Sequence, residues 1–230
     1  RHSDLQIKEL LPRLAVVARA LPADKSRLVR LEHPEIGGEK CKYLLPPKTQ
    51  SLLLPVLDDV IKSKDAADSV VVRKSDNISC VQTESVQIYF RHTERKYPNY
   101  NAVIPAPKSF CRKAVMNRQD LISAVTRAAL FSDAGSMLLK FQFDAASEYA
   151  VIEASDVVFE TSSNEKVKCE FEGGELMIGV QATSLKEILQ HLTSERIRMS
   201  MIDQTRQIVF TEENGNPNVL MMMMPMLLNV

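Results

Sequence analysis

Few side chains in this sequence have the types and spacing that catalysis or metal binding needs. Asp58 and Asp59 are adjacent carboxylates, a pair that acid–base chemistry could use, but they end a helical pattern and are expected on its solvated face. The sequence holds no G-x-x-x-x-G-K-[ST], G-x-G-x-x-G, H-E-x-x-H or G-x-S-x-G motif. We therefore predict a protein that is not an enzyme and needs no cofactor.

The cysteines and histidines are too scattered to suggest a metal site. No C-x-x-C pair occurs, and the cysteines are expected to be reduced and mostly buried thiols rather than a disulfide framework. The histidines show no metal-ligand spacing, and each is expected at the surface or with its hydrogen bonds satisfied. These residues are Cys41, Cys80, Cys111, Cys169, His2, His33, His92 and His191.

The C-terminal stretch could instead bind apolar peptides. Residues 219–228 read Val-Leu-Met-Met-Met-Met-Pro-Met-Leu-Leu, with five of the chain's 10 methionines and no charge. Pro225 cannot donate to a strand ladder, so a buried strand should run into a flexible apolar lip. Methionine is unbranched and polarizable, which suits a surface that repacks around different peptides. The alternative is a buried last strand whose methionines are only core residues.

The overall composition is that of a globular protein without bulk charge. Lys+Arg and Asp+Glu number 29 each in 230 residues, so any contact with nucleic acid requires a local asymmetry of charge. No apolar stretch approaches the roughly 18 residues of a membrane span, and the N-terminus does not resemble a secretory signal. We expect a cytoplasmic protein.

The chain repeats one order of elements: a strand, an amphipathic helix and three strands. The clearest copy has a strand at 176–179, a helix along Leu185, Ile188, Leu189 and Leu192, and strands at 196–201, 207–210 and 219–224. Ser184 and Glu187 have the spacing of a capping box at the start of its helix. The repeat predicts an α+β architecture whose sheets are covered by helices on one face.

Two earlier copies are also visible. One begins with Asn117 as a helix cap, followed by strands at 137–141, 149–152 and 157–159. The other has a strand at 42–45, a helix capped by Thr49 and kinked or delayed by Pro55, and strands at 70–72, 78–81 and 86–90. Residues 1–30 resemble part of a fourth copy.

This repeat, ending in Met-Pro-Met, resembles the bacterial β sliding clamp, the processivity subunit of the replicative DNA polymerase. Residues 95–105 (Arg-Lys-Tyr-Pro-Asn-Tyr-Asn-Ala-Val-Ile-Pro) are similar to the family's linker between its second and third domains. Residues 223–226 (Met-Met-Pro-Met) are similar to its C-terminal signature. Residues 23–28 (Ala-Asp-Lys-Ser-Arg-Leu) are similar to a loop usually read as Thr-Asp-Gly-His-Arg-Leu.

The resemblance implies that residues 1–102 are an incomplete second clamp domain and residues 103–230 a complete third domain. In the family, helices line a central hole, sheets form the outer wall, and two subunits close a ring around duplex DNA. The cations expected to face DNA are Lys48, Arg127 and Lys186; the alternative is that Arg127 and Lys186 are ordinary solvated helix charges. Leu130 and Phe131 match the family's subunit contact and should be partly exposed.

The resemblance also implies a peptide pocket between the last two domains, which receives short apolar motifs from polymerase, clamp loader and repair proteins. Ala102 and Leu227 stand where the best-known members have arginine, so the rim here is less basic. The expected wall comprises Arg27, Leu28, Pro98, Val103, Met222, Met223, Met224, Pro225, Met226 and Leu228. The alternative function is a generic protein-interaction module of repeated α+β units, unrelated to replication.

Overall fold

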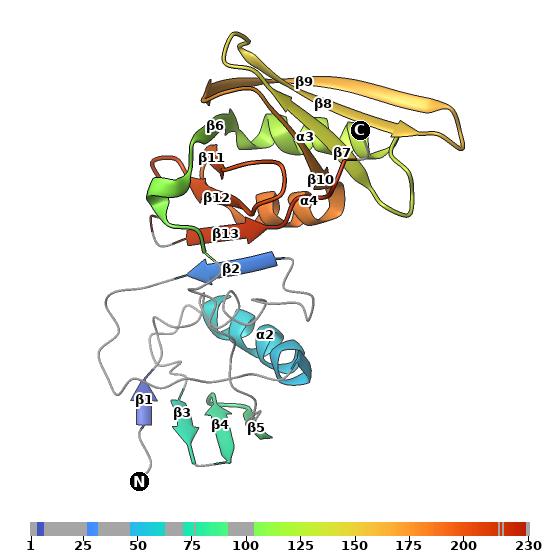
Figure 1. The fold of residues 1–230 in the computed structure, drawn as a ribbon. Helices are drawn as coiled ribbons and strands as arrows, with labels where there is room; N and C mark the ends of the chain where they lie inside the picture. The colour runs from blue at the N-terminus through green and yellow to red at the C-terminus, as the bar shows by residue number, and fades with distance from the viewer. Residues whose placement is uncertain are drawn as a thin grey trace. The chain divides into compact units, whose positions relative to one another are not determined.

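The computed structural model describes residues 4–6, 27–31, 47–62, 71–75, 77–91, 104–215, 217 and 219–228. The chain divides into two compact units, residues 1–20 with 31–99 and residues 21–30 with 100–230 (Figure 1). Residues 21–30 join the second unit, and the assignment of residues 1–102 and 103–230 to two clamp domains stays a prediction. The strand predicted at 42–45 lies outside the described residues.

The first unit contains a four-stranded antiparallel sheet and one long helix. The sheet order is β1-β3-β4-β5, with β1 at Asp4–Gln6, β3 at Val71–Lys74, β4 at Ile78–Gln82 and β5 at Gln87–Arg91. The three strands predicted at 70–90 are therefore confirmed. Strand β1 pairs with β3 from a sequence distance of more than sixty residues, which no local pattern could indicate.

Helix α2 of the first unit (Pro47–Lys62) begins earlier than predicted. Proline has a fixed φ that suits a first helical turn, so Pro47 starts the helix and Thr49 lies buried inside it rather than capping it. Pro55 lies within the helix and does not delay its start. Leu53 and Leu57 form the buried side of this helix.

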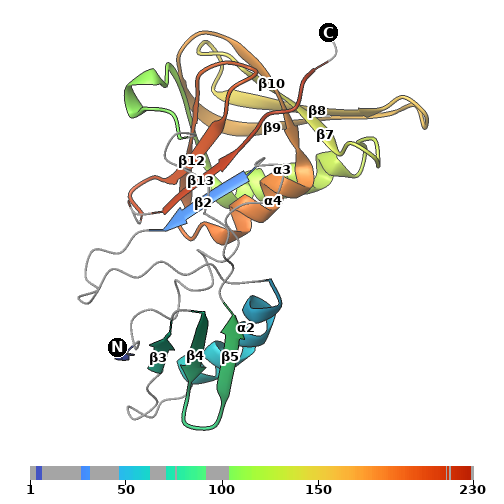
Figure 2. The ribbon, with the colours of Figure 1, turned by 60° about the horizontal axis from the view of Figure 1, so that its bottom comes forward.

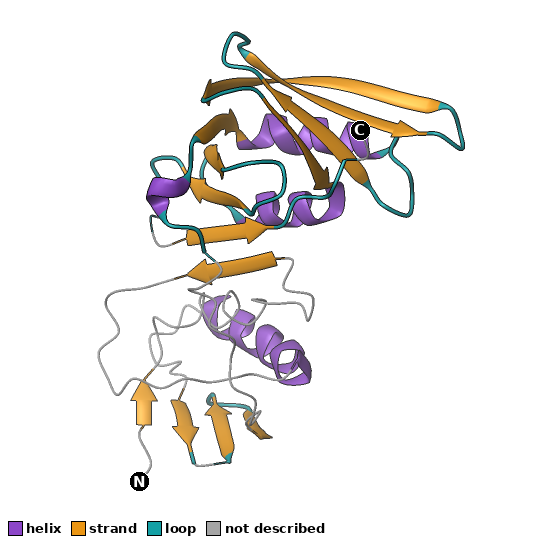
Figure 3. Cartoon of the chain, viewed as in Figure 1, coloured by secondary structure: helices purple, strands orange, loops and turns teal. Residues whose placement is uncertain are grey.

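The second unit contains two consecutive βαβββ copies, which confirms the predicted order (Figure 3). The first copy is β6 (Arg112–Asn117), α3 (Arg118–Ala129), β7 (Leu138–Phe143), β8 (Tyr149–Asp156) and β9 (Thr161–Glu172). The second is β10 (Leu176–Gln181), α4 (Ala182–His191), β11 (Arg196–Met201), β12 (Ile208–Glu212) and β13 (Val219–Met223).

These strands and β2 (Arg27–Leu31) form one sheet in the order β10-β7-β8-β9-β6-β11-β12-β13-β2. An isolated antiparallel bridge joins Gly179 on β10 to Met226, just beyond β13. With β2 set aside, the eight strands of the two copies therefore form a closed cycle from β10 to β13 and back to β10. Exchanging the strands of the first copy for those of the second leaves this cycle unchanged. An approximate two-fold relation between the copies requires this pattern of pairing.

Helices α3 and α4 pack against each other beside the curled sheet (Figure 2). Their buried residues join alternate residues of the strands in one main core, for example Leu121 on α3, Leu185 on α4, Phe141 on β7 and Phe210 on β12. The confirmed α+β fold thus follows from strands with period-two burial and helices with one apolar stripe. Within the part of the chain that the structure describes, no helix is long and apolar enough to cross a membrane.

The two helices of the second unit begin differently. The Asn117 side chain accepts hydrogen bonds from the backbone N–H groups of Gln119 (2.9 Å) and Asp120 (3.1 Å), which confirms the predicted cap of α3. The predicted capping box of α4 is wrong. The α4 cap is Gln181, and Ser184 lies in the first turn with its hydroxyl donating to the Gln181 side chain at 2.6 Å.

The β8–β9 hairpin corrects a second prediction, the strand at 157–159. Asp156 Oδ1 accepts hydrogen bonds from the N–H groups of Val158 (2.9 Å) and Phe159 (3.1 Å), so its carboxylate folds these residues into a turn. The strand that follows is instead the polar segment beginning at Thr161, paired with β8 from Asp156↔Thr161 to Tyr149↔Lys168. The side chains of Val157, Val158 and Phe159 are consequently exposed at the hairpin tip.

Candidate functional site

Strand β13 divides the methionine run between two faces. Its register with β12 pairs Ile208 with Met223, Val209 with Met222 and Phe210 with Met221. Because side chains alternate along a strand, Met221 and Met223 enter the main core, and Met222 lies on the opposite side. The alternative prediction, methionines as core residues, therefore holds for Met221 and Met223.

Met222 belongs to a small second cluster on the outer face, meaning the side of strands β6, β11, β12 and β13 that turns away from the main core. Met222 and Val209 are both buried there, and Ile104, Phe110 and Leu220 pack against them while remaining partly exposed. Ile104 and Phe110 flank a short 3-10 helix, Pro107–Ser109. Partly exposed apolar side chains around a buried methionine form a surface that an apolar group can enter.

Sequence reasoning missed Ile104, Phe110 and Val209 as members of this cluster. Ile104 and Phe110 are the large apolar residues of a proline-rich connection, and that isolation is the signal that could have identified them. Val209 could have been found from the alternation of β12, since its neighbours Ile208 and Phe210 face the main core.

The C-terminal segment, Met224–Leu228, extends from this cluster and is anchored at Met226. Met224 is 37% exposed and Leu227 77% exposed, whereas Pro225, Met226 and Leu228 are half-buried. Met226 N–H donates to the Gly179 carbonyl at 2.9 Å. The predicted apolar lip is thus a short segment whose middle is hydrogen-bonded to β10.

Other predicted wall residues are only partly placed. Arg27 and Leu28 lie on β2, a strand rather than the predicted loop, and β2 is the neighbour of β13 in the sheet. Pro98 and Val103 lie outside the described residues, as does Ala102. The second unit therefore brings β2, the Met222 cluster and the C-terminal segment to one end of the sheet.

The predicted DNA-facing cations differ in their surroundings. Arg127 on α3 forms two hydrogen bonds with Glu165 on β9, from Nε to Oε1 at 3.0 Å and from Nη2 to Oε2 at 2.7 Å. These bonds lower the pKa of Glu165 below its ordinary value and keep the pair charged. Lys186 is half-buried on α4, and Lys48 is exposed on α2 of the first unit.

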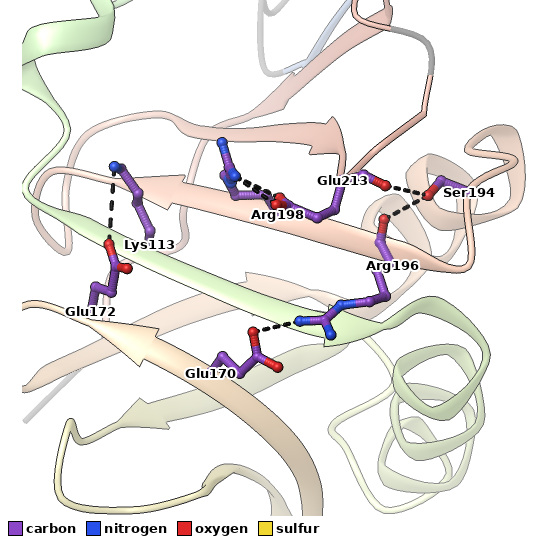
Figure 4. Close-up of polar contacts among 7 residues, drawn as sticks. All are labelled: Lys113, Glu170, Glu172, Ser194, Arg196, Arg198 and Glu213. Carbon is purple, nitrogen blue, oxygen red and sulfur yellow. Dashed lines mark hydrogen bonds and ion pairs between the residues drawn. The ribbon is translucent and has the colours of Figure 1, made fainter.

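Charges on the outer face are matched in pairs (Figure 4). Lys113 lies 4.0 Å from Glu172, Arg196 contacts Glu170, and Arg198 lies 2.7 Å from Glu213. Exposed pairs of this kind contribute only about 0–1 kcal/mol each to stability. Their main consequence is that each of these three cations is compensated by a neighbouring carboxylate, which weakens its attraction for phosphate.

Leu130 and Phe131, the predicted subunit contact, follow α3 directly and are 78% and 40% exposed. Their predicted exposure is confirmed, while their role stays a prediction. Asp58 and Asp59 are exposed on α2, as expected for a solvated face. Among the described residues, no cluster of three or more His, Cys, Asp or Glu side chains is arranged to hold a metal ion.

The described cysteines only partly match the expectation of buried thiols. Cys80 and Cys169 are buried and reduced, and burial raises the pKa of Cys169 to about 12. Cys111 is reduced but exposed, with its sulfur 3.3 Å from the carbonyl oxygen of Ile202.

Comparison with known proteins identifies the fold as that of sliding clamps. A clamp from Thermotoga maritima has a TM-score of 0.84 and 20% identity over 99% of this chain and 65% of its own. A clamp from Pseudomonas aeruginosa, solved bound to griselimycin, has a TM-score of 0.83 and 19% identity over 99% of this chain and 66% of its own.

The family assignment rests on sequence as well. The model for the DNA polymerase III beta subunit, C-terminal domain, matches residues 102–227, more than half of the chain, and the chain belongs to this family. The beta sliding clamp of Pseudomonas putida is 29% identical over 131 residues, 57% of this chain and 34% of the relative. The chain thus spans about a third of that curated relative. These matches do not favour an interaction module unrelated to replication.

Proposed function

We propose that this chain is part of a sliding clamp, a non-catalytic cytoplasmic processivity factor that encircles duplex DNA and tethers the replicative polymerase. The family match over residues 102–227 carries this proposal, and the doubled βαβββ fold supports it. A ring holds DNA topologically, so it needs neither base recognition nor strong phosphate binding. The formal net charge of +0 suits topological retention of DNA, because tight phosphate contacts would make the retention of DNA by the ring strongly salt-dependent.

DNA is proposed to contact the helical side of the second unit rather than its outer face. The outer face carries paired charges, as in Lys113–Glu172, and the Arg127 charge on α3 is already compensated by Glu165. Lys186 on α4 is therefore the better DNA-contacting candidate in this unit, and Lys48 is the candidate on α2. In fluorescence anisotropy at low salt, Lys186→Ala should weaken duplex DNA binding, and the outer-face control Lys113→Ala should leave it unchanged.

Partner proteins are proposed to dock short apolar motifs at the Met222 cluster and the C-terminal segment. Buried Met222 and Val209 would form the floor, and the partly exposed Ile104, Phe110 and Leu220 the walls. Strand β2, carrying Arg27 and Leu28, lies beside β13 at the same end of the sheet. Polymerase, clamp loader and repair proteins are the partners proposed. The griselimycin-bound clamp of P. aeruginosa supplies a ligand for the test.

The test measures griselimycin binding by calorimetry for the parent chain and for Met224→Ala. Met224 is 37% exposed, so its truncation should leave the fold intact and remove contacts worth roughly 1–3 kcal/mol if it anchors the ligand. That corresponds to a loss of about fivefold to a hundredfold in affinity. Leu130→Ala, which truncates another exposed apolar side chain at the end of α3, is the control and should bind as the parent does. Equal binding by parent and Met224→Ala would contradict the proposed site.

A further inference from the structure

Gly179 lies where the sheet of the second unit closes. Strand β10 pairs with β7 along one edge, and its other contact in the sheet is the single bridge from Gly179 to Met226. Leu176, Ile178 and Val180 face the main core, so Gly179 belongs to the opposite side of the strand. Gly179 is nevertheless buried, which means that the C-terminal segment covers it.

The space at Gly179 accepts no side chain. A Cβ atom added there would lie 2.4 Å from the Met226 carbonyl oxygen, 3.0 Å from Leu228 Cδ2 and 3.1 Å from Leu138 Cδ1. The first contact is with backbone, which a rotamer change cannot relieve. The hydrogen bond from Met226 N–H to the Gly179 carbonyl oxygen therefore requires that residue 179 has no side chain.

The equivalent junction in the first βαβββ copy has no such requirement. Val115 precedes the end of β6 by two residues, as Gly179 precedes the end of β10. Val115 pairs with Glu170 in a ladder that runs from Lys113↔Glu172 to Met116↔Cys169. The regular ladder there accommodates valine, whereas a Cβ atom at the single Gly179–Met226 bridge would lie 2.4 Å from a backbone carbonyl oxygen.

We infer that Gly179 is a positioning residue for the apolar docking site: by admitting the Met226 backbone, it fixes the C-terminal segment that forms one side of the site. This inference rests on the proposed function for the docking itself, but the anchoring of Met226 can be tested without a ligand. Once Met226 is fixed, Met224 and Leu227 on either side are presented at the surface, where they are 37% and 77% exposed. A side chain at position 179 displaces this segment as a unit.

The experiment compares the parent chain with Gly179→Ala by amide hydrogen exchange at Met226 and by titration with griselimycin. Gly179→Ala should accelerate Met226 exchange at least tenfold, shift the Met224 methyl resonance and weaken griselimycin binding at least tenfold. Gly174→Ala is the matched control, because a Cβ there has its nearest neighbour, Arg112 Nη2, at 3.8 Å. Ile152→Val, a mild core truncation on β8, controls for lost stability and should leave Met226 exchange and affinity unchanged.

The outcomes separate the anchoring from the docking. Unchanged Met226 exchange in Gly179→Ala overturns the inference, because the alanine would then fit beside an intact bridge. Faster exchange with unchanged griselimycin affinity also overturns it, since the segment would be released without effect on the site. If the parent chain fails to bind griselimycin, the proposed docking site is refuted, and Met226 exchange still decides whether Gly179 anchors the segment.

Discussion

Alanine substitutions at Met222 and Met223 compare two neighbouring methionines that serve opposite faces of β13. Their exposed fractions are 1% and 2%, so the two truncations remove equally buried side chains. Truncating a buried methionine costs about 2–5 kcal/mol of unfolding free energy. Met223 lies in the main core, and we expect about 3–4 kcal/mol there. Met222 packs in the small cluster with partly exposed neighbours, so we expect Met222→Ala to lower the unfolding free energy by only about 2 kcal/mol.

The order reverses for ligand binding. Met222→Ala should weaken griselimycin binding by about 1–2 kcal/mol, roughly fivefold to thirtyfold, because it removes the floor of the proposed site. Met223→Ala should change the affinity less than about twofold while the protein is folded. Because the chain contains no tryptophan, urea unfolding is best followed through the methionine methyl resonances. Affinity is measured by calorimetry. If Met223→Ala weakens binding as much as Met222→Ala, the assignment of the two faces to core and site is refuted.

Three further predictions concern ionisation, reactivity and assembly. The folded-state pKa of Glu165 lies below its usual 4.5, so its pairing with Arg127 stabilises the fold above pH 4.5. This stabilisation is lost as the pH falls through the lowered pKa. In urea unfolding measured at several pH values, Glu165→Gln should therefore lose less unfolding free energy on acidification than the parent chain does. Cys111 should react with a thiol reagent in the native state and Cys169 should not. Because the pKa of Cys169 is raised from 9.0 to about 12, its contribution to stability is complete below pH 9 and is lost between pH 9 and 12, a loss absent in Cys169→Ala. The resemblance to the clamp family implies a ring closed by contacts between the third domain of one subunit and the first domain of the other, and residues 1–230 are expected to comprise only second- and third-domain sequence. A polypeptide of these 230 residues should therefore sediment as a monomer, and a stable closed dimer would contradict that arrangement.

The sequence predicted the order of elements well because local periodicity determines it. The apolar stripe of α3 and the alternation of β11 needed no knowledge of distant residues, and Asn117 caps α3 through bonds within three positions. The β8–β9 hairpin was harder to predict, because Val157–Phe159 look like a strand and Thr161–Asn164 do not. The carboxylate of Asp156 and the pairing with β8 outweigh those intrinsic preferences.

The candidate site was predictable in its composition but not in its geometry. A run of four methionines carries no alternation of residue type, so the sequence could not show that Met222 and Met223 face opposite sides. The register with β12 decides this, and it depends on pairing across the sheet. The position of β2 beside β13 joins residues nearly two hundred positions apart, beyond the reach of any local pattern.

The tip of the β8–β9 hairpin also bears on how the protein behaves at high concentration. Val157, Val158 and Phe159 are 88%, 81% and 74% exposed, and together they form a short uncharged apolar segment. Such segments promote self-association unless flanking charges oppose it, and here Asp156 and Glu160 stand immediately on either side. Of these two carboxylates, Asp156 is only 7% exposed, so the colloidal stability of this hairpin tip depends mainly on the exposed Glu160. Asp156 itself holds the turn that exposes the apolar residues.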